Sequence, residues 1–379
     1  MRTYLTLIIF LNSLFLQGQN IPELKNRCGS ISKGLAKVIS KDNMQKILRA
    51  SSISEPYLVK VYFTVFSDND GTNQATNEDT IVKRFQSMVN FYRDRNICFA
   101  LIGIRYIRNS DYNVQDADNE ESEMYDMRIP NCLNVFIHNE LFVSYGNIGG
   151  IAYDIPNTDA FISINENSFN SFTYPSLMPH EIGHVFGLYH TFETHPGDPL
   201  HGRENVDRTG PCSDCSLDGD LLCDTPADPD ISTNDSYLRN NTDNNCQYIG
   251  SRVDECGVLY TPDTRNIMSY GRTTCLRFFS INQGQRMRYY ISTETGLQNV
   301  MAQNEEVNFL PATYSNETGW GVARDLYQFL PTIAPIMYNG SANYIFQANK
   351  IIVSPGNASV KFSPSAGGKI VLKKNQYCN

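Results

Sequence analysis

The chain has 379 residues, which is enough to bury a sizeable core in two or three structural units. Its 40 acidic residues outnumber 31 basic ones and give a net charge of −9, which argues against nucleic acid as a partner. The acidic residues cluster between positions 207 and 235, and this clustering suggests that the segment binds cations.

Residues 1–18 have the features of a secretory signal peptide, with Arg2 as a positive start, an apolar core at 4–16 and Gly18 as a small residue for cleavage. The apolar stretch is too short for a transmembrane anchor and is interrupted by polar residues. No later segment is long and apolar enough to span a bilayer. We therefore expect a secreted, extracellular protein without a membrane span. Ten cysteines suit that compartment, because disulfides persist there.

The first half of the chain predicts alternating strands and helices. Residues 19–55 are polar and lack a core pattern, which suits a propeptide. Strands are then predicted from apolar or alternating runs, and helices from apolar residues at helical spacing. The strands cover 57–66, 98–107, 132–138 and 160–165, and the helices cover 80–93, the segment around 180 and 280–297. This order indicates an α/β arrangement with the helix near 180 beneath a sheet.

The most informative stretch runs from His180 to His190 and reads HEIGHVFGLYH. On a helix, His180 and His184 lie one turn apart on the same face, so both rings can reach one metal ion. Gly187 lets the chain turn and deliver His190 to the same point, because glycine accepts a positive φ. Three neutral nitrogens leave a fourth position open, which is typical of a catalytic zinc site, and Glu181 lies where it can act as general base. The alternative is a buried amphipathic helix whose histidines merely form hydrogen bonds.

A second motif, Asn266–Tyr270, fits the Met-turn that accompanies this zinc motif in metzincins. Met268 is expected to form a soft floor beneath the metal without bonding to it. Tyr270 follows two residues later, within reach of the oxyanion that develops on a substrate carbonyl. An isolated methionine would more often be ordinary core, but beside the zinc motif the functional interpretation is favoured.

The second half of the chain changes in character. Residues 194–263 are dense in Asp, Asn, Gly and Pro and are improbable as a bare loop, so we expect disulfides and bound cations to hold them in shape. From about residue 308, short strands are broken by Gly and Pro. We assign 56–300 to a catalytic domain and 301–379 to a β-rich module for surface attachment or secretion. An ordinary extension packed on the catalytic domain is the alternative.

Taken together, the chain resembles a metzincin of the pappalysin type, the group whose bacterial members are also called cytophagalysins. The residues that carry the resemblance are the zinc motif with LYHTF at 188–192, the run GDLLCDTP at 219–226, and the Met-turn with residues 275–288. It covers roughly residues 25–295. The resemblance implies an α/β (α+β) catalytic domain: a twisted mixed sheet, an active-site helix and a loop-rich C-terminal subdomain, with the small β accessory module outside it.

The resemblance also favours further ligands and disulfides. Asp220, Asp224 and Thr225 offer hard oxygen ligands that suit calcium. The resemblance suggests two disulfides that would cross-link the long loop. A third disulfide is expected because both of its cysteines flank strand-like runs. These three pairs are Cys223–Cys256, Cys246–Cys275 and Cys98–Cys132. Cys212 and Cys215 pair locally or act separately.

The segment Arg27–Ser30, with the letters RCGS, resembles the cysteine-switch element of the same group. The Cys28 thiolate is then expected to occupy the fourth zinc position in a latent zymogen. The alternative is a disulfide between Cys28 and Cys378 that joins the two ends of the chain.

The expected function is therefore that of a secreted zinc endopeptidase that hydrolyses protein or peptide substrates through a zinc-bound water, with Glu181 as general base. Substrate is expected to pair along an edge strand near 160–165. The alternative is a catalytically silent binding or adhesion protein on a metzincin scaffold, and such proteins typically lose the glutamate. The resemblance also suggests that relatives cutting at arginine carry an acidic residue just before the cysteine after the Met-turn. Here Thr273 and Thr274 precede Cys275, so a basic substrate side chain is less favoured.

Overall fold

The computed structural model describes Cys28 and residues 55–193, 203–231, 235–308, 312–331, 335–353, 358–365 and 367–375. The predicted signal peptide, all of the predicted propeptide apart from Cys28 and Glu55, and Cys378 lie outside the described residues. Within them, no helix has the length and apolarity needed to cross a membrane.

A five-stranded sheet forms the centre of the molecule, in the order β2-β1-β4-β8-β7. The first four strands run parallel, and only β7 is antiparallel to its neighbour. Parallel strands are covered on both faces, which explains why β1 reads as a nearly continuous apolar run. The bounds are β1 Tyr57–Ser67, β2 Ile97–Arg108, β4 Leu133–His138, β7 Gly150–Ile151 and β8 Phe161–Asn165. The predicted α/β class is therefore confirmed.

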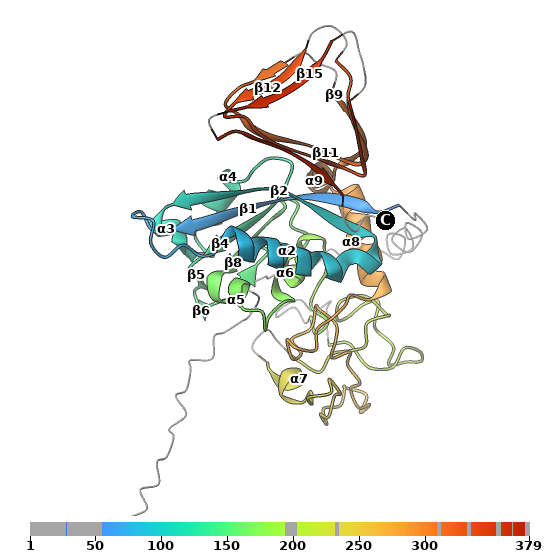
Figure 1. Cartoon of the computed structure of the whole chain (residues 1–379). Helices are drawn as coiled ribbons and strands as arrows, with labels where there is room; N and C mark the ends of the chain where they lie inside the picture. Colours follow the sequence, from blue (N-terminus) through green and yellow to red (C-terminus); the bar gives the residue numbers. More distant parts are fainter. Residues whose placement is uncertain are drawn as a thin grey trace, which may run out of the picture.

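Helices α2 (Glu78–Tyr92) and α6 (Leu177–Val185) lie on one face of this sheet (Figure 1). The side chain of Asn77 accepts a hydrogen bond from the Thr80 backbone N–H at the start of α2, and this cap fixes where the helix begins. Its apolar stripe packs with the underside of the sheet and with α6 in the main core, which includes Met88, Tyr92 and Ile182. The segment that carries the histidine motif therefore rests on a fully buried core.

Further helices and short strands complete the first unit, residues 55–300. They are η1 Arg93–Arg95, α3 Ser110–Asn113, β3 Val114–Asp116, α4 Glu121–Asp126, β5 Glu140–Val143, β6 Gly146–Asn147, α5 Glu166–Asn170, α7 Tyr237–Asn240, α8 Ile281–Thr293 and α9 Thr295–Val300. One of them, α7, lies in the loop-rich region away from the sheet (Figure 1). The closing helix expected at 280–297 is thus two helices, and Ser280 and Gln283 form a capping box at the start of the first.

The predicted edge position of residues 160–165 is wrong. Strand β8 pairs with β4 on one side and with β7 on the other, so it is an inner strand. The edge is β7, and Cys28 forms a parallel β-bridge to Gly150 on it. The sequence offered little warning, because Gly150–Ile151 is too short to show an alternating pattern.

The loop-rich region between α6 and α8 contains three disulfides among the described residues: Cys212–Cys256, Cys215–Cys223 and Cys246–Cys275. The predicted Cys246–Cys275 pair is present. The predicted Cys223–Cys256 pair is wrong, because the loop folds back so that the Cα atoms of Cys215 and Cys223 lie 4.9 Å apart, within bonding range. The Cys98–Cys132 pair is also wrong: Cys132 is a buried free thiol, whereas Cys98 is disulfide-bonded elsewhere.

The C-terminal strands form a small prism above the sheet (Figure 1), built entirely from parallel pairs. Its strands are β9 Gln303–Asn308, β10 Ala312–Tyr314, β11 Thr318–Phe329, β12 Ile336–Gly340, β13 Asn343–Ala348, β14 Lys350–Val353, β15 Val360–Pro364 and β16 Lys369–Lys374. Strand β11 bends from one face to the next, because its first half pairs with β13 and its second half with β9 and β14. Successive coils thus stack like those of a solenoid.

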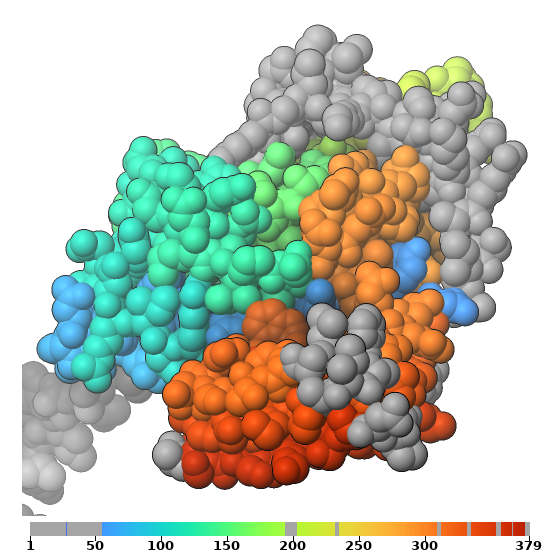
Figure 2. Space-filling view, turned by 90° about the horizontal axis from the view of Figure 1, so that it is seen from above, coloured from blue at the N-terminus to red at the C-terminus, as the bar shows by residue number. Residues whose placement is uncertain are grey.

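The prism packs on the face of the sheet that α2 and α6 leave open, and Figure 2 shows it as a compact body beside the first unit. Val322 shares a buried cluster with Leu58 and Tyr62, and the rings of Tyr62 and Trp320 lie 6.1 Å apart between centroids. The module is therefore anchored to β1 by apolar contacts.

Candidate active site

Helix α6 carries the first two histidines and is buried along almost its whole length. It ends at Phe186, and the backbone N–H of Leu188 donates to the carbonyl of Gly183 in the 6→1 pattern of a Schellman ending. Gly187 has a φ of +86°, and a Cβ added there would lie 2.2 Å from the Tyr290 ring. Only glycine fits this turn, which is what redirects the chain toward His190.

The three histidines converge on one point. The Nε2 atom of His184 lies 3.1 Å from the Nε2 atoms of both His180 and His190. A tetrahedral zinc ion with Zn–N bonds near 2.0–2.1 Å separates its nitrogen ligands by roughly 3.3–3.4 Å. The observed spacing is close to that value, so the three side chains fit one zinc ion.

The hydrogen bonds on the opposite ring nitrogens fix how the histidines face this point. The Nδ1 atoms of His180 and His184 each lie 2.7 Å from a backbone carbonyl, that of Ile267 and that of Leu188. A carbonyl cannot donate, so each Nδ1 carries the proton and each Nε2 presents a lone pair. Burial, reinforced by the neighbouring histidines, lowers the pKa of His180 to about 3 and that of His184 well below its usual range. Two lone pairs facing each other at 3.1 Å repel, and a cation between them removes that repulsion.

His190 is oriented by a residue that the sequence analysis did not single out. Its Nδ1 lies 3.1 Å from a carboxylate oxygen of Glu193, three residues further on. The next residue, Thr191, donates from its hydroxyl to buried Asp228. The signal for Glu193 was available, because metal-ligating histidines almost always have a hydrogen-bond acceptor at the second nitrogen.

Glu181 and Cys28 meet beside the histidines. The Cys28 thiol donates a hydrogen bond to the Glu181 carboxylate at 3.2 Å. Among the described residues, Cys28 and the three histidines form a group that could hold a metal ion, with ligand atoms within 4.8 Å of one another. A Cβ on Gly150 would lie 2.9 Å from Glu181 Cγ, so glycine at this edge position lets the carboxylate lie against β7. Glu181 and Cys28, which the sequence analysis names as general base and cysteine switch, therefore lie at one site.

The Met-turn lies under α6 as expected from the motif. Met268 is fully buried, and its sulfur lies 2.8 Å from where a Cβ of Gly183 would be, so glycine in the helix makes room for the thioether. The ring of Tyr270 packs beside His180 and His190, and its hydroxyl donates to the Cys28 carbonyl at 3.2 Å. Burial, with Cys28 nearby, raises the pKa of Tyr270 well above its usual range, so its hydroxyl remains a donor.

The predicted calcium residues are only partly brought together. Asp220 is buried; its Oδ1 accepts from the Leu222 N–H and from the Thr225 hydroxyl, and its Oδ2 has no partner among the described residues. Asp224 instead caps α8 by accepting from the Ser280 hydroxyl and the Asn282 N–H. Both oxygens of Asp224 are therefore already used as a helix cap.

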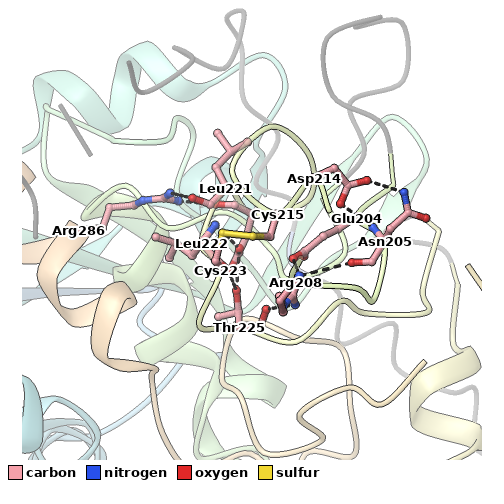
Figure 3. The surroundings of a disulfide bond; sticks show 11 residues. Glu204, Asn205, Arg208, Asp214, Cys215, Leu221, Leu222, Cys223, Thr225 and Arg286 are labelled. Atoms are coloured by element: carbon pink, nitrogen blue, oxygen red, sulfur yellow. Dashed lines mark hydrogen bonds and ion pairs between the residues drawn. A yellow bond between two sulfur atoms is a disulfide. The ribbon is translucent and has the colours of Figure 1, made fainter. Parts of the chain in front are cut away.

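A different carboxylate lies near Asp220. Glu204 also has an unpartnered buried oxygen, Oε2, and its other oxygen pairs with Arg208 (Figure 3). Burial and the proximity of Asp220 raise the pKa of Glu204, and burial raises the pKa of Asp220. The arrangement is held by the Cys215–Cys223 disulfide and by Arg286, which donates to the carbonyls of residues 220 and 221.

Comparison with known proteins finds similarity to metallopeptidases. Residues 75–191, from the segment before α2 to just past the third histidine, match the family described as "Metallo-peptidase family M12B Reprolysin-like". Extracellular metalloproteases of Arthroderma benhamiae and Trichophyton verrucosum are each 24% identical over 275 residues, covering 69% of this chain and 82% of the relative. One from Neurospora crassa is 24% identical over 247 residues, covering 61% and 74%.

Two solved structures of Tannerella forsythia proteins are also similar. Mature mirolysin in complex with a cleaved peptide is 18% identical with a TM-score of 0.44, over 65% of this chain and 95% of mirolysin. A promirolysin mutant is 18% identical with a TM-score of 0.45, over 72% and 95%. The fold is a mixed α/β one, and residues 75–191, which hold the histidines, are similar to reprolysin-like metallopeptidases.

Proposed function

We propose that this protein is a secreted zinc-dependent endopeptidase of the pappalysin type, made as a latent zymogen. The observation that supports this most directly is the convergence of three Nε2 atoms at 3.1 Å spacing with the carboxylate of Glu181 beside them. The extracellular names of the relatives and the three disulfides agree with an exported protein.

In this proposal His180, His184 and His190 hold the zinc ion. Bound there, zinc supplies a Lewis acid that polarises the scissile carbonyl and lowers the pKa of water to about 7. Glu181 accepts a proton from the attacking water and passes it to the leaving amine. Tyr270 donates its hydroxyl hydrogen to the oxyanion once the Cys28 carbonyl no longer accepts it.

Substrate is proposed to lie along the outer edge of β7, where the strand has no neighbour on one side other than Cys28 among the described residues. Cys28 forms its β-bridge to Gly150 there, so an extended peptide can use the same backbone groups. The thiol of Cys28 lies within 4.8 Å of the histidine nitrogens, where it can act as a fourth ligand and hold the precursor inactive. The Cys28–Cys378 alternative requires a disulfide, whereas Cys28 keeps its thiol in the structure.

A calcium site is proposed at Asp220, with Thr225 as a ligand expected from the sequence and Glu204 as a nearby addition. Asp224, also expected from the sequence, is not included, because both of its carboxylate oxygens cap α8. The two unpartnered carboxylate oxygens of Asp220 and Glu204 support it, because a buried carboxylate without a partner is costly. The domain assignment stays as 1–18 signal peptide, 19–55 propeptide, 56–300 catalytic domain and 301–379 β-rich module.

The test is hydrolysis of casein by wild type and by Glu181→Gln, with zinc content measured on the same samples. We expect the variant to lose activity by a factor of ~10² or more while zinc stays near one per chain, because Glu181 acts as base and not as ligand. Chelation of the wild type should abolish the activity. Full activity in Glu181→Gln would refute the role of Glu181 as general base. No chelator-sensitive hydrolysis by the activated wild type would instead favour the catalytically silent binding protein.

A further inference from the structure

A pocket opens beside the histidine cluster, and its walls come from Cys28 and from three further parts of the chain. His180 and Tyr270 form the edge toward the proposed catalytic centre. Leu177 and Leu276 contribute apolar walls from α6 and from the segment after the Met-turn, and Arg239 contributes the third part from α7. A substrate side chain close to the scissile bond is the group that such a pocket receives.

Arg239 is the one charged side chain apart from the histidine among the described residues that line this pocket. It is half-buried, and its Nε atom is shielded from solvent and has no hydrogen-bond partner. Two other arginines of the loop-rich region have carboxylate partners: Arg208 pairs with Glu204 and Arg252 pairs with Asp235. Among the described residues, Arg239 has no carboxylate to neutralise it, so the pocket carries an uncompensated positive charge.

The other polar groups of the pocket suit an anion rather than a cation. None of the described residues that line it is an aspartate or a glutamate. Ser176 and Thr273 add hydroxyl groups, which can donate hydrogen bonds to a carboxylate. A lysine or arginine side chain would meet Arg239 as a like charge in a partly desolvated place, which is unfavourable.

We propose that Arg239 determines specificity by binding the carboxylate of an aspartate or glutamate in the substrate, at a position flanking the scissile bond. The guanidinium group can bind a carboxylate through two parallel hydrogen bonds, and half-burial strengthens them relative to water. The apolar walls accommodate the methylene groups of the acidic side chain. This inference rests on the proposed peptidase function and assigns its substrate class.

The experiment compares cleavage of a peptide library by active enzyme prepared from the full chain, with cleavage sites read by mass spectrometry. Rates are then measured on a peptide pair that differs only by Glu or Gln at the selected position. The variants are Arg239→Gln, Arg239→Glu and, as a matched control, Arg272→Gln. Arg272 lies just after the Met-turn, but its guanidinium donates to Asn244 and does not line the pocket.

We expect wild type to prefer the Glu peptide over the Gln peptide by roughly tenfold or more in kcat/KM. Arg239→Gln should lose that preference, Arg239→Glu should shift it toward Lys or Arg, and Arg272→Gln should keep it. No acidic preference in wild type, a preference retained by Arg239→Gln, or an equal loss in Arg272→Gln would each overturn the inference. Chelator-sensitive hydrolysis without acidic preference refutes this inference alone, whereas absence of any such hydrolysis refutes the proposed function and the inference with it.

Discussion

Replacing Gly187 with alanine tests whether the turn after α6, and not only the helix itself, builds the histidine cluster. Gly187 has a φ of +86°, and a Cβ there would lie 2.2 Å from Cδ2 and 2.4 Å from Cε2 of the Tyr290 ring. Tyr290 is only 8% exposed and belongs to the main core, so its ring has little room to retreat. The substitution therefore imposes both backbone strain and a steric clash.

The two costs can be estimated separately. A left-handed backbone conformation costs a residue with a Cβ about 1–2 kcal/mol. Overpacking a well-filled core costs about 1–3 kcal/mol more. We expect Gly187→Ala to lower the free energy of unfolding by about 2–5 kcal/mol. Because His190 follows this turn, the affinity for zinc should also fall, by roughly 10–100-fold if the effect resembles the loss of a supporting contact.

Gly210 provides the matched control. Its φ is +91°, but a Cβ there meets nothing within 4 Å, so Gly210→Ala should carry only the backbone cost of about 1–2 kcal/mol and leave zinc affinity unchanged. The measurements are urea unfolding at saturating zinc and zinc titration against a competing chelator. The double variant Gly187→Ala/Tyr290→Leu should recover part of the stability. Equal losses in both single variants would refute the argument from the Tyr290 contact.

Three further predictions follow from other buried groups. Cys28→Ala should make the unprocessed chain active early, whereas Cys132→Ala, at a buried thiol away from the site, should stay latent; equal latency in both would reject the switch. Calcium should raise the melting temperature, and more so at pH 8 than at pH 5. Burial raises the pKa values of Glu204 and Asp220, so the calcium-free folded state loses stability as pH rises above about 4; a flat response at saturating zinc counts against the site. Burial lowers the pKa of His138 to about 4, so the unfolded chain binds the extra proton below about pH 6.5. This contribution to the free energy of unfolding is therefore complete above pH 6.5 and falls by on the order of 3 kcal/mol toward pH 4. His138→Gln should remove this fall when urea unfolding is measured as a function of pH.

The histidine cluster could be predicted because its geometry is local. His180 and His184 are related by one helical turn and His190 by one glycine turn, so short-range rules suffice to bring them together. The same holds for β1, β2, β4 and β8, whose long apolar runs are visible in the sequence. Strand β7 was missed because two residues carry no pattern, although it is the edge on which Cys28 lies.

The disulfides show where local rules stop. Five of the six cysteines in the three observed disulfides, from Cys212 to Cys256, lie in a region almost without regular structure, so their pairing depends on how the loop folds back. Cys223 pairs with Cys215, only 8 residues away, and Cys212 takes Cys256 over 44 residues. Nothing in the spacing distinguishes this arrangement from the one suggested by the resemblance.

The pair that was predicted, Cys246–Cys275, has a consequence for specificity. Arg239 lies seven residues before Cys246 and Thr273 lies two residues before Cys275, and both line the pocket beside the histidines. The disulfide therefore ties the segment that carries the pocket's positive charge to the segment that follows the Met-turn. The ligands of the proposed zinc site need no such tie, because one helix and one turn hold them. The proposed catalytic centre is thus specified by short-range sequence, whereas the charge of the adjoining pocket depends on a cross-link in a loop whose pairing short-range rules do not determine.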